Sequence, residues 1–137
     1  MSAEAKVPRN FKLLDELDEA EKSSKGGADV SLGLARADDT FMSDWSASIF
    51  AQAGGGEPRM WFLQLHADAE YPNKAPTVRF TSKVNMDCVD AKGTVVIAKV
   101  PYLASWNPKK TLLGAVQDIK GLLMRAPRSQ PPDGVNY

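Results

Sequence analysis

Three short segments with alternating apolar and polar or small residues constrain the fold of this chain more than any other feature. In Val30–Leu34, Trp45–Ile49 and Met60–His66, every second residue is apolar. A period of two places alternate side chains on opposite faces of a β-strand. Glycine-rich turns, Gly26–Gly27 and Gly54–Gly56, precede the first and third segments. The pattern therefore predicts an antiparallel meander with one buried face.

The outward positions of these strands carry small residues and one soft apolar residue. They are Ser31, Gly33, Ser46, Ser48 and Met60. A solvated sheet face usually carries long charged side chains. The small residues here instead leave the backbone accessible, beside one flexible apolar side chain, that of Met60. Two interpretations stay open: an ordinary strand surface built from small residues, and a docking surface for another globular protein.

Two segments with helical spacing flank the strands. The first starts at Pro8, which suits the first turn of a helix, and extends through Lys22. At about 100° per residue its apolar residues fall within one arc of roughly 120°, opposite a charged face. The apolar arc holds Leu13, Leu14, Leu17 and Ala20, and the charged face holds Asp15, Glu16, Asp18, Glu19 and Lys22. Phe11 lies well off this arc, which favours either an aromatic folded back on a loop or an exposed anchor for a partner protein.

The second helix is predicted from Thr111, a suitable cap, to a stop at Pro127. Its apolar residues recur at spacings of four, three and four, and they are Leu112, Val116, Ile119 and Leu123. Gly114 and Gly121 each cost such a helix roughly 0.5 to 1 kcal/mol relative to alanine. Packing against the rest of the domain must therefore hold this helix together.

The remaining chain adds a short strand and a long loop. Pro72 and Pro76 frame a turn before the strand Thr77–Phe80, and Ser82–Asn107 has no strong period. A long irregular stretch inside a compact domain is more often functional than not. We expect one α+β domain over residues 1–137, with residues 1–6 flexible.

Composition excludes several classes of function. Seventeen basic and seventeen acidic residues give zero net charge, so no basic field for nucleic acid is expected. No apolar run approaches the roughly 20 residues of a membrane span. A single cysteine rules out an internal disulfide and a cysteine-rich zinc site. We expect no cofactor, no metal, no nucleic-acid partner and no membrane contact, and a reducing compartment, cytoplasm or nucleus.

The single thiol and the single imidazole are weak candidates for catalysis. Cys88 lies directly after Asp87 and two residues before Asp90, and these negative charges disfavour the thiolate. A role for Cys88 as a small apolar core residue is therefore favoured over a role as nucleophile. The chain has no second histidine, and its one cysteine, Cys88, lies 22 residues from His66 in the sequence. A role as ligand or base is therefore disfavoured.

The chain resembles the active-site half of a ubiquitin-conjugating enzyme that has lost its reactive thiol. The family carries Y-P-x-x-x-P, then G-x-I-C-L-D with the nucleophile, then W-x-P. This chain has Tyr71–Pro76, Gly93–Ile97 and Trp106–Pro108 at the corresponding places. By this resemblance Val96 stands at the nucleophile position, and valine cannot form a thioester.

Further segments resemble the ubiquitin-conjugating enzyme variants, the inactive relatives of the Mms-two and Uev-one type. They are Val7–Leu17, Ser31–Leu34, Trp45 and Gln130–Gly134. The resemblance implies a UBC-like fold with an N-terminal helix, a four-stranded antiparallel meander and a long irregular loop. A second long helix would follow, without the extra C-terminal helices of many active members.

The resemblance also implies a function. In this family the variant pairs with an active conjugating enzyme, and the heterodimer builds chains through lysine 63 of ubiquitin. Val7, Pro8 and Phe11 would belong to the segment that inserts into the enzyme, and Ser31, Ser48 and Met60 to the surface that holds acceptor ubiquitin weakly and non-covalently. Met60 replaces an expected isoleucine, a change of shape worth under about 1.5 kcal/mol. A ubiquitin ligase would recruit the complex indirectly, in DNA damage tolerance or signalling.

Two alternatives remain open from the residues alone. The chain is then either a stand-alone module of the same fold that binds ubiquitin or a proline-containing peptide, or an active conjugating enzyme that uses Cys88 as a displaced nucleophile. A reducing-agent-sensitive ubiquitin adduct on the isolated chain would identify the active enzyme that uses Cys88. Neither the stand-alone module nor the inactive variant forms such an adduct.

Overall fold

A four-stranded sheet with helices on one face forms the structure. The computed structural model describes residues 9–25, 29–36, 38–54, 57–132 and 134–137, and for residues 23–25 it describes the backbone alone. The expected flexibility of residues 1–6 and the predicted roles of Val7 and Pro8 fall outside these ranges.

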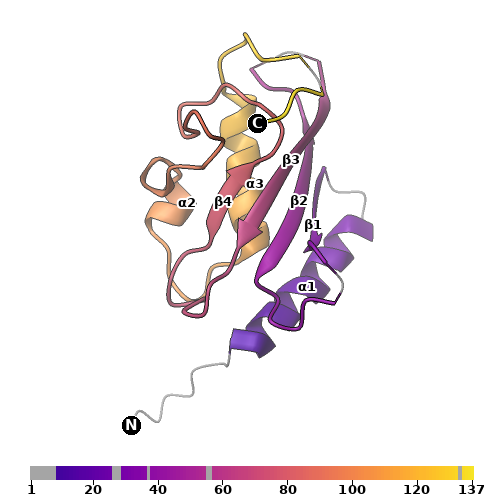
Figure 1. Cartoon of the computed structure of the whole chain (residues 1–137), viewed down its shortest axis with the longest axis vertical. Helices are drawn as coiled ribbons and strands as arrows, with labels where there is room; N and C mark the ends of the chain where they lie inside the picture. Colours follow the sequence, from indigo (N-terminus) through magenta and orange to yellow (C-terminus); the bar gives the residue numbers. More distant parts are fainter. Residues whose placement is uncertain (1–8, 26–28, 37, 55–56, 133) are drawn as a thin grey trace.

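The sheet confirms the predicted meander. Its strands follow chain order and every neighbouring pair is antiparallel. Their bounds are β1 Val30–Leu34, β2 Asp44–Ala51, β3 Arg59–His66 and β4 Thr77–Phe80. Burial alternates along β2 and β3, so one face carries the core, including Trp45, Ile49, Trp61, Leu63 and Leu65. In Figure 1, helix α3 lies behind this sheet and α1 runs beside β1, so the helices leave the opposite face open.

Helix α1, Arg9–Lys25, forms where the sequence predicted it, but its buried face is rotated. Leu13 and Ala20 are buried as expected, and Leu17 packs against the core. Leu14, assigned to the apolar arc, is exposed, whereas Glu16, assigned to the charged face, is only 4% exposed. Both assignments were wrong, because Glu16 has buried polar partners that the local pattern does not reveal.

Glu16 joins three parts of the fold. Its carboxylate accepts hydrogen bonds from the Tyr71 hydroxyl and from the backbone N–H of Leu112. Burial raises the pKa of Glu16, an effect that these hydrogen bonds and the nearby Lys12 oppose. Burial and the Glu16 charge raise the pKa of Tyr71, so its hydroxyl stays protonated and donates. The first helix, the Tyr71 turn and the start of α3 are thereby held together.

The loop after β4 is more ordered than the lack of periodicity suggested. It contains a 3₁₀ turn, η1, at Ile97–Lys99 and a four-residue helix, α2, at Pro101–Ala104. Pro101 occupies the start of α2, where its missing N–H costs nothing. Trp106 fixes the far end of the loop, because its indole N–H donates to the Pro72 carbonyl at 2.8 Å.

Helix α3, Leu112–Met124, confirms the second predicted helix, and it ends three residues before Pro127. The Thr111 hydroxyl accepts the Gly114 N–H at 3.0 Å, the predicted cap. A Cβ atom on Gly114 would stand 2.2 Å from the Tyr102 hydroxyl oxygen. Glycine at this position lowers helix propensity, but it also allows α2 and α3 to approach each other closely.

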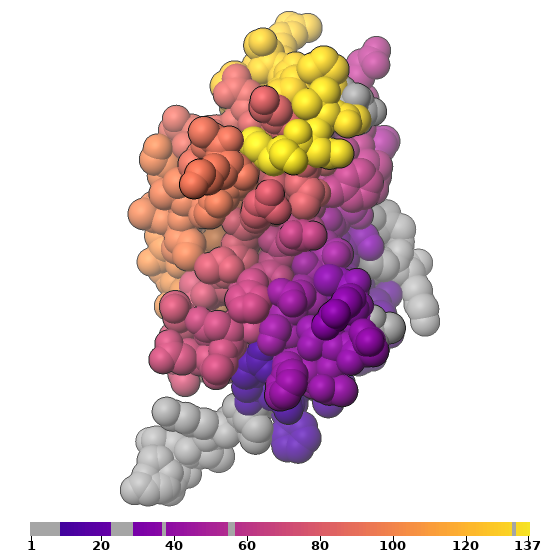
Figure 2. Space-filling model, viewed as in Figure 1, coloured from indigo at the N-terminus to yellow at the C-terminus, as the bar shows by residue number. Residues whose placement is uncertain are grey.

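The C-terminal residues run back along the segment that follows β4. Ser82 pairs with Asn136, the Lys83 N–H donates to the Val135 carbonyl, and the Tyr137 hydroxyl donates to the Val84 carbonyl at 3.0 Å. Among the described residues after Arg125 there is no helix, as the resemblance implied. In Figure 2 these residues, in yellow, cover the upper end of the open sheet face.

Candidate functional site

The segment that resembles a conjugating-enzyme active site forms a tight turn that leads into η1. Val89 bridges to Val95, and the Asp90 carboxylate accepts the backbone N–H groups of Lys92 and Thr94. Gly93 has φ 91°, a left-handed conformation that favours glycine. Val96, directly before η1, has 36% of its surface exposed. This turn thus presents a branched hydrocarbon at its surface.

Cys88 lies beneath this turn. Its carbonyl accepts the Val96 N–H at 2.7 Å, while its side chain belongs to the core and only 4% of the residue is exposed. Burial raises the pKa of the Cys88 thiol, and the neighbouring Asp87 raises it further. A buried, protonated thiol is a poor nucleophile, so the expectation of an apolar filler agrees with its surroundings.

Phe11 lies on the outer side of α1, with 62% of its surface exposed. The sequence therefore placed it correctly off the buried stripe. Leu14, one turn further along, is exposed as well, so the start of α1 presents two apolar side chains to solvent. Val7 and Pro8, assigned to the same segment, lie outside the described residues. Whether these residues bind a partner enzyme stays a prediction.

The open face of the sheet, called the outer face below, carries the residues assigned to acceptor ubiquitin. Ser31 lies directly opposite Ser48 across β1 and β2, and Met60 lies opposite Phe50 across β2 and β3. Ser31 and Met60 are exposed, and Ser48 is half-buried. The strand register therefore brings the three onto one face, as their alternation predicted, and their role in binding stays a prediction.

The outer face is more apolar than the sequence indicated. Besides Met60 it exposes Phe50 and Phe62, which form with Met60 an outer apolar cluster. Phe62 pairs with Ser48 in the register, so the cluster borders the two serines. The expectation of a single apolar residue on this face was wrong. The alternation already gave the direction of Phe62, and only the length of β2 was needed to place Phe50.

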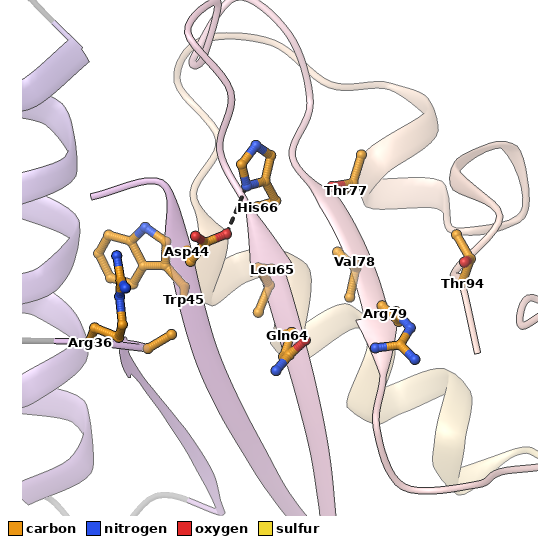
Figure 3. Close-up of a pocket in the computed structure, with 11 residues that line it drawn as sticks. Arg36, Asp44, Trp45, Gln64, Leu65, His66, Thr77, Val78, Arg79 and Thr94 are labelled. Atoms are coloured by element: carbon orange, nitrogen blue, oxygen red, sulfur yellow. Dashed lines mark hydrogen bonds and ion pairs between the residues drawn. The ribbon is translucent and has the colours of Figure 1, made fainter. Parts of the chain in front are cut away.

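The other end of the outer face is polar and hollowed. A cavity of about 580 Å³ is lined there by residues of all four strands or their extensions, including Arg36, Gln64, His66 and Arg79. Figure 3 shows Arg36 and Arg79 on opposite sides of it, with His66 between β2 and β4. The His66 ring nitrogen Nδ1 lies 2.9 Å from the Asp44 carboxylate. The sequence missed this pair because its members are 22 residues apart and meet only through the β2–β3 register.

This pair alone does not make a hydrolytic site. Both side chains are about half exposed, and the chain's one thiol is Cys88, which the core buries. Among the described residues no group of three or more histidine, cysteine, aspartate or glutamate side chains has the arrangement of a metal site. Within the same part of the chain, no helix is long and apolar enough to cross a membrane.

Comparisons with known proteins agree with this geometry. The profile of a family described as ubiquitin-conjugating enzyme matches residues 12–136. The ubiquitin-conjugating enzyme spm2 of Schizosaccharomyces pombe is 38% identical, with 97% of this chain and 99% of that protein covered. Ubiquitin-conjugating enzyme E2 variant 1C of Arabidopsis thaliana is 38% identical, covering 96% and 93%. The variant MMS2 of Saccharomyces cerevisiae is 34% identical, with 85% of each covered.

Solved structures show the same fold at lower identity. Human ubiquitin-conjugating enzyme E2 G1 superposes with a TM-score of 0.67 over 87% of this chain and 98% of that chain, at 23% identity. A putative ubiquitin conjugating enzyme from Plasmodium yoelii gives a TM-score of 0.68 at 19% identity, over 87% and 74%.

Proposed function

Because the chain belongs to the ubiquitin-conjugating enzyme family, among its variants, we propose that it is a non-catalytic subunit of a ubiquitin-conjugating complex. In this proposal it pairs with an active conjugating enzyme and positions acceptor ubiquitin for the synthesis of lysine-63-linked chains. The enzyme supplies the chemistry, and this chain supplies two surfaces.

One observation carries the proposal: Val96 is exposed at the turn, whereas Cys88, whose carbonyl accepts the Val96 N–H, is buried. We infer that Val96 occupies the position of the family's nucleophile, at the turn between Gly93 and η1. Its side chain has no lone pair to attack a thioester. The only sulfur nucleophile of the chain is shielded in the core and has a raised pKa. A ubiquitin thioester must therefore form on a partner.

The chemical step then belongs to the complex. The partner's cysteine carries donor ubiquitin as a thioester, and the amine of one acceptor lysine attacks the carbonyl carbon. An isopeptide bond forms, the carbon–sulfur bond breaks, and the departing thiolate of the partner takes up the proton that the amine loses. Fixing the orientation of the acceptor contributes several kcal/mol to such a bimolecular step. That contribution is large enough to select one lysine among several.

The surface for the partner enzyme is assigned to the start of α1, with Phe11 as its described member and Val7 and Pro8 before it. A mostly exposed phenyl ring on a helix that is clamped to the core suits an interface anchor. The surface for acceptor ubiquitin is assigned to Ser31, Ser48 and Met60 on the outer face. Weak, non-covalent binding suits an acceptor that must leave as a longer chain.

The pathway is a further part of the proposal. A ubiquitin ligase would bring the complex to its target in DNA damage tolerance or signalling, in the cytoplasm and nucleus. Balanced charge, with 17 basic and 17 acidic residues, is compatible with a protein that works through protein contacts and not through direct binding of nucleic acid.

The test combines a thioester assay with a binding assay. With activating enzyme, ATP and ubiquitin, the isolated chain is expected to form no reducing-agent-sensitive adduct, and Cys88→Ala is expected to change nothing when the active partner is added. Phe11→Ala is expected to abolish co-elution with the partner in size-exclusion chromatography, since it removes the anchor. A thioester on the isolated chain would contradict the proposal.

The outer face alone also suits a second function, a stand-alone recognition module for ubiquitin or a peptide. The cavity of about 580 Å³ and the outer apolar cluster are both formed by this chain alone, so a ligand could bind to them without a partner enzyme. Phe11→Ala separates the two functions, because Phe11 lies on α1 and not on the sheet. A recognition module keeps its ligand in this variant, whereas a scaffold subunit loses both its partner and chain synthesis.

A further inference from the structure

Phe41, in the connection between β1 and β2, is the most exposed large apolar side chain in the described part of the structure. Fully 72% of its surface is open to solvent, more than for Phe11. Its neighbour in the chain, Met42, is buried. The loop thus directs one apolar side chain into the core and holds the next one out of it.

A set of hydrogen bonds fixes the backbone that carries Phe41. The Asp39 carboxylate accepts the N–H groups of Phe41, Ser43 and Asp44, at 3.1, 3.0 and 3.2 Å. These bonds, that of Asp44 first, lower the pKa of Asp39, so it is ionised at neutral pH. Met42 has φ 52°, an unusual conformation for a residue with a side chain. The loop is preorganised, so a bound partner would cost it little further ordering.

Arg9 connects this loop to the first turn of α1. Its guanidinium donates to the Phe41 carbonyl at 2.5 Å, to the Ser43 hydroxyl at 3.2 Å, and to the Ala67 and Asp68 carbonyls at 2.8 and 2.9 Å. Arg9 lies two residues before Phe11. The loop and the helix start therefore share one end of the molecule, the lower end in Figure 1.

We propose that Phe41 is a second aromatic anchor for the active conjugating enzyme that Phe11 engages. This inference rests on the proposed function and extends its partner surface from one element to two. Both rings are exposed, both stand on backbone held by the core, and Arg9 links the two elements. Two anchors on separate elements fix the orientation of a partner, which one anchor on a single helix does not.

The charges around Phe41 indicate what the enzyme must present. Between Arg36 and Asp44 the chain has three aspartates and one arginine. The contact of Arg36 with Asp38 is 3.9 Å long and both side chains are largely exposed, so it neutralises little. On α1, Asp15 is exposed as well. Arg9, which donates to the Phe41 carbonyl, brings a second cation beside the three aspartates, so the charge left around the ring is only slightly negative. The complementary surface is an apolar pocket with a small excess of lysine or arginine at its rim.

The experiment compares Phe41→Ala with Phe62→Ala, because each removes an exposed phenyl ring and only Phe41 belongs to the proposed partner surface. Calorimetric titration with the active conjugating enzyme is expected to show a dissociation constant at least tenfold larger for Phe41→Ala than for the wild type. Phe62→Ala is expected to change it less than twofold. Neither exposed ring supports the core, and thermal unfolding of both variants checks this.

Phe11→Ala in the same titration separates the two levels of the proposal. If Phe11→Ala weakens binding and Phe41→Ala does not, the second anchor is refuted and the proposed function stands. If neither weakens binding, the proposed function itself fails. If Phe41→Ala instead abolishes self-association in sedimentation while partner binding is unchanged, Phe41 contacts a second copy of this chain and the inference is overturned.

Discussion

At the scale of single residues, Glu16 is the position where burial and charge conflict most. Burial raises its native pKa above the ordinary value of 4.5, so the native protein binds this proton more tightly than the unfolded chain does. Its contribution to stability is therefore most favourable below about pH 4.5 and declines as the pH rises through the native pKa. The conflict is tolerated because Tyr71 and the Leu112 N–H both donate to the carboxylate.

Glu16→Gln is expected to remove this pH dependence. Urea unfolding at a series of pH values measures it. The unfolding free energy of the wild type minus that of the variant should fall as the pH rises from 4.5 through the native pKa, and then level off. Asp39 and Asp68, whose pKa values are lowered, occur in both proteins and cancel in the difference. A difference that is constant or rises with pH would show that burial does not dominate at Glu16.

The same residue shows what a local pattern cannot give. Helical periodicity placed Glu16 among exposed charges and Leu14 in the core, and the structure has them the other way around. The partners of Glu16 are 55 and 96 residues away in the chain. No period within one helix contains that information. Phe11, by contrast, needed only its angle on the helix to be placed in solvent.

At the scale of elements, strands were predictable because burial alternates on them. All four occur where the apolar alternation or the flanking prolines placed them, and the order of the strands in the sheet follows chain order. Loops were less predictable, since their order depends on capping side chains and long-range packing. The Asp39 loop and the short helix α2 both form through contacts that leave no period in the sequence.

The two glycines of α3 provide a matched test of packing at this scale. Gly121→Ala meets nothing within 4 Å and is expected to stabilise the protein by about 0.5 to 1 kcal/mol, through helix propensity. Gly114→Ala would drive a methyl group into the Tyr102 hydroxyl, which also accepts the Thr111 N–H at 2.9 Å. Overpacking of this kind costs about 1 to 3 kcal/mol.

Urea unfolding of the two α3 variants beside the wild type decides between propensity and packing. The expected signs are opposite: a higher midpoint for Gly121→Ala and a lower one for Gly114→Ala. Equal stabilisation by both substitutions would mean that α2 does not pack against α3 as closely as described.

At the scale of the whole molecule, the two proposed surfaces lie on different parts of the fold. The partner surface is at the start of α1 and its neighbouring loop, while the acceptor surface is on the open face of the sheet. Strand alternation and helix angle predicted that Ser31, Met60 and Phe11 point outward, and all three are exposed. The sequence did not show that Phe41 and Phe50 are exposed too, since both lie outside the segments whose alternation was read.

In the proposed function, this protein directs the linkage of polyubiquitin without carrying ubiquitin itself. The most direct test is the linkage of chains formed by the active conjugating enzyme with and without this chain, identified by mass spectrometry of the digested products. We expect polyubiquitin joined through lysine 63 only when both proteins are present, and none from ubiquitin in which that lysine is arginine. Chains of the same linkage and rate in the absence of this chain would contradict it.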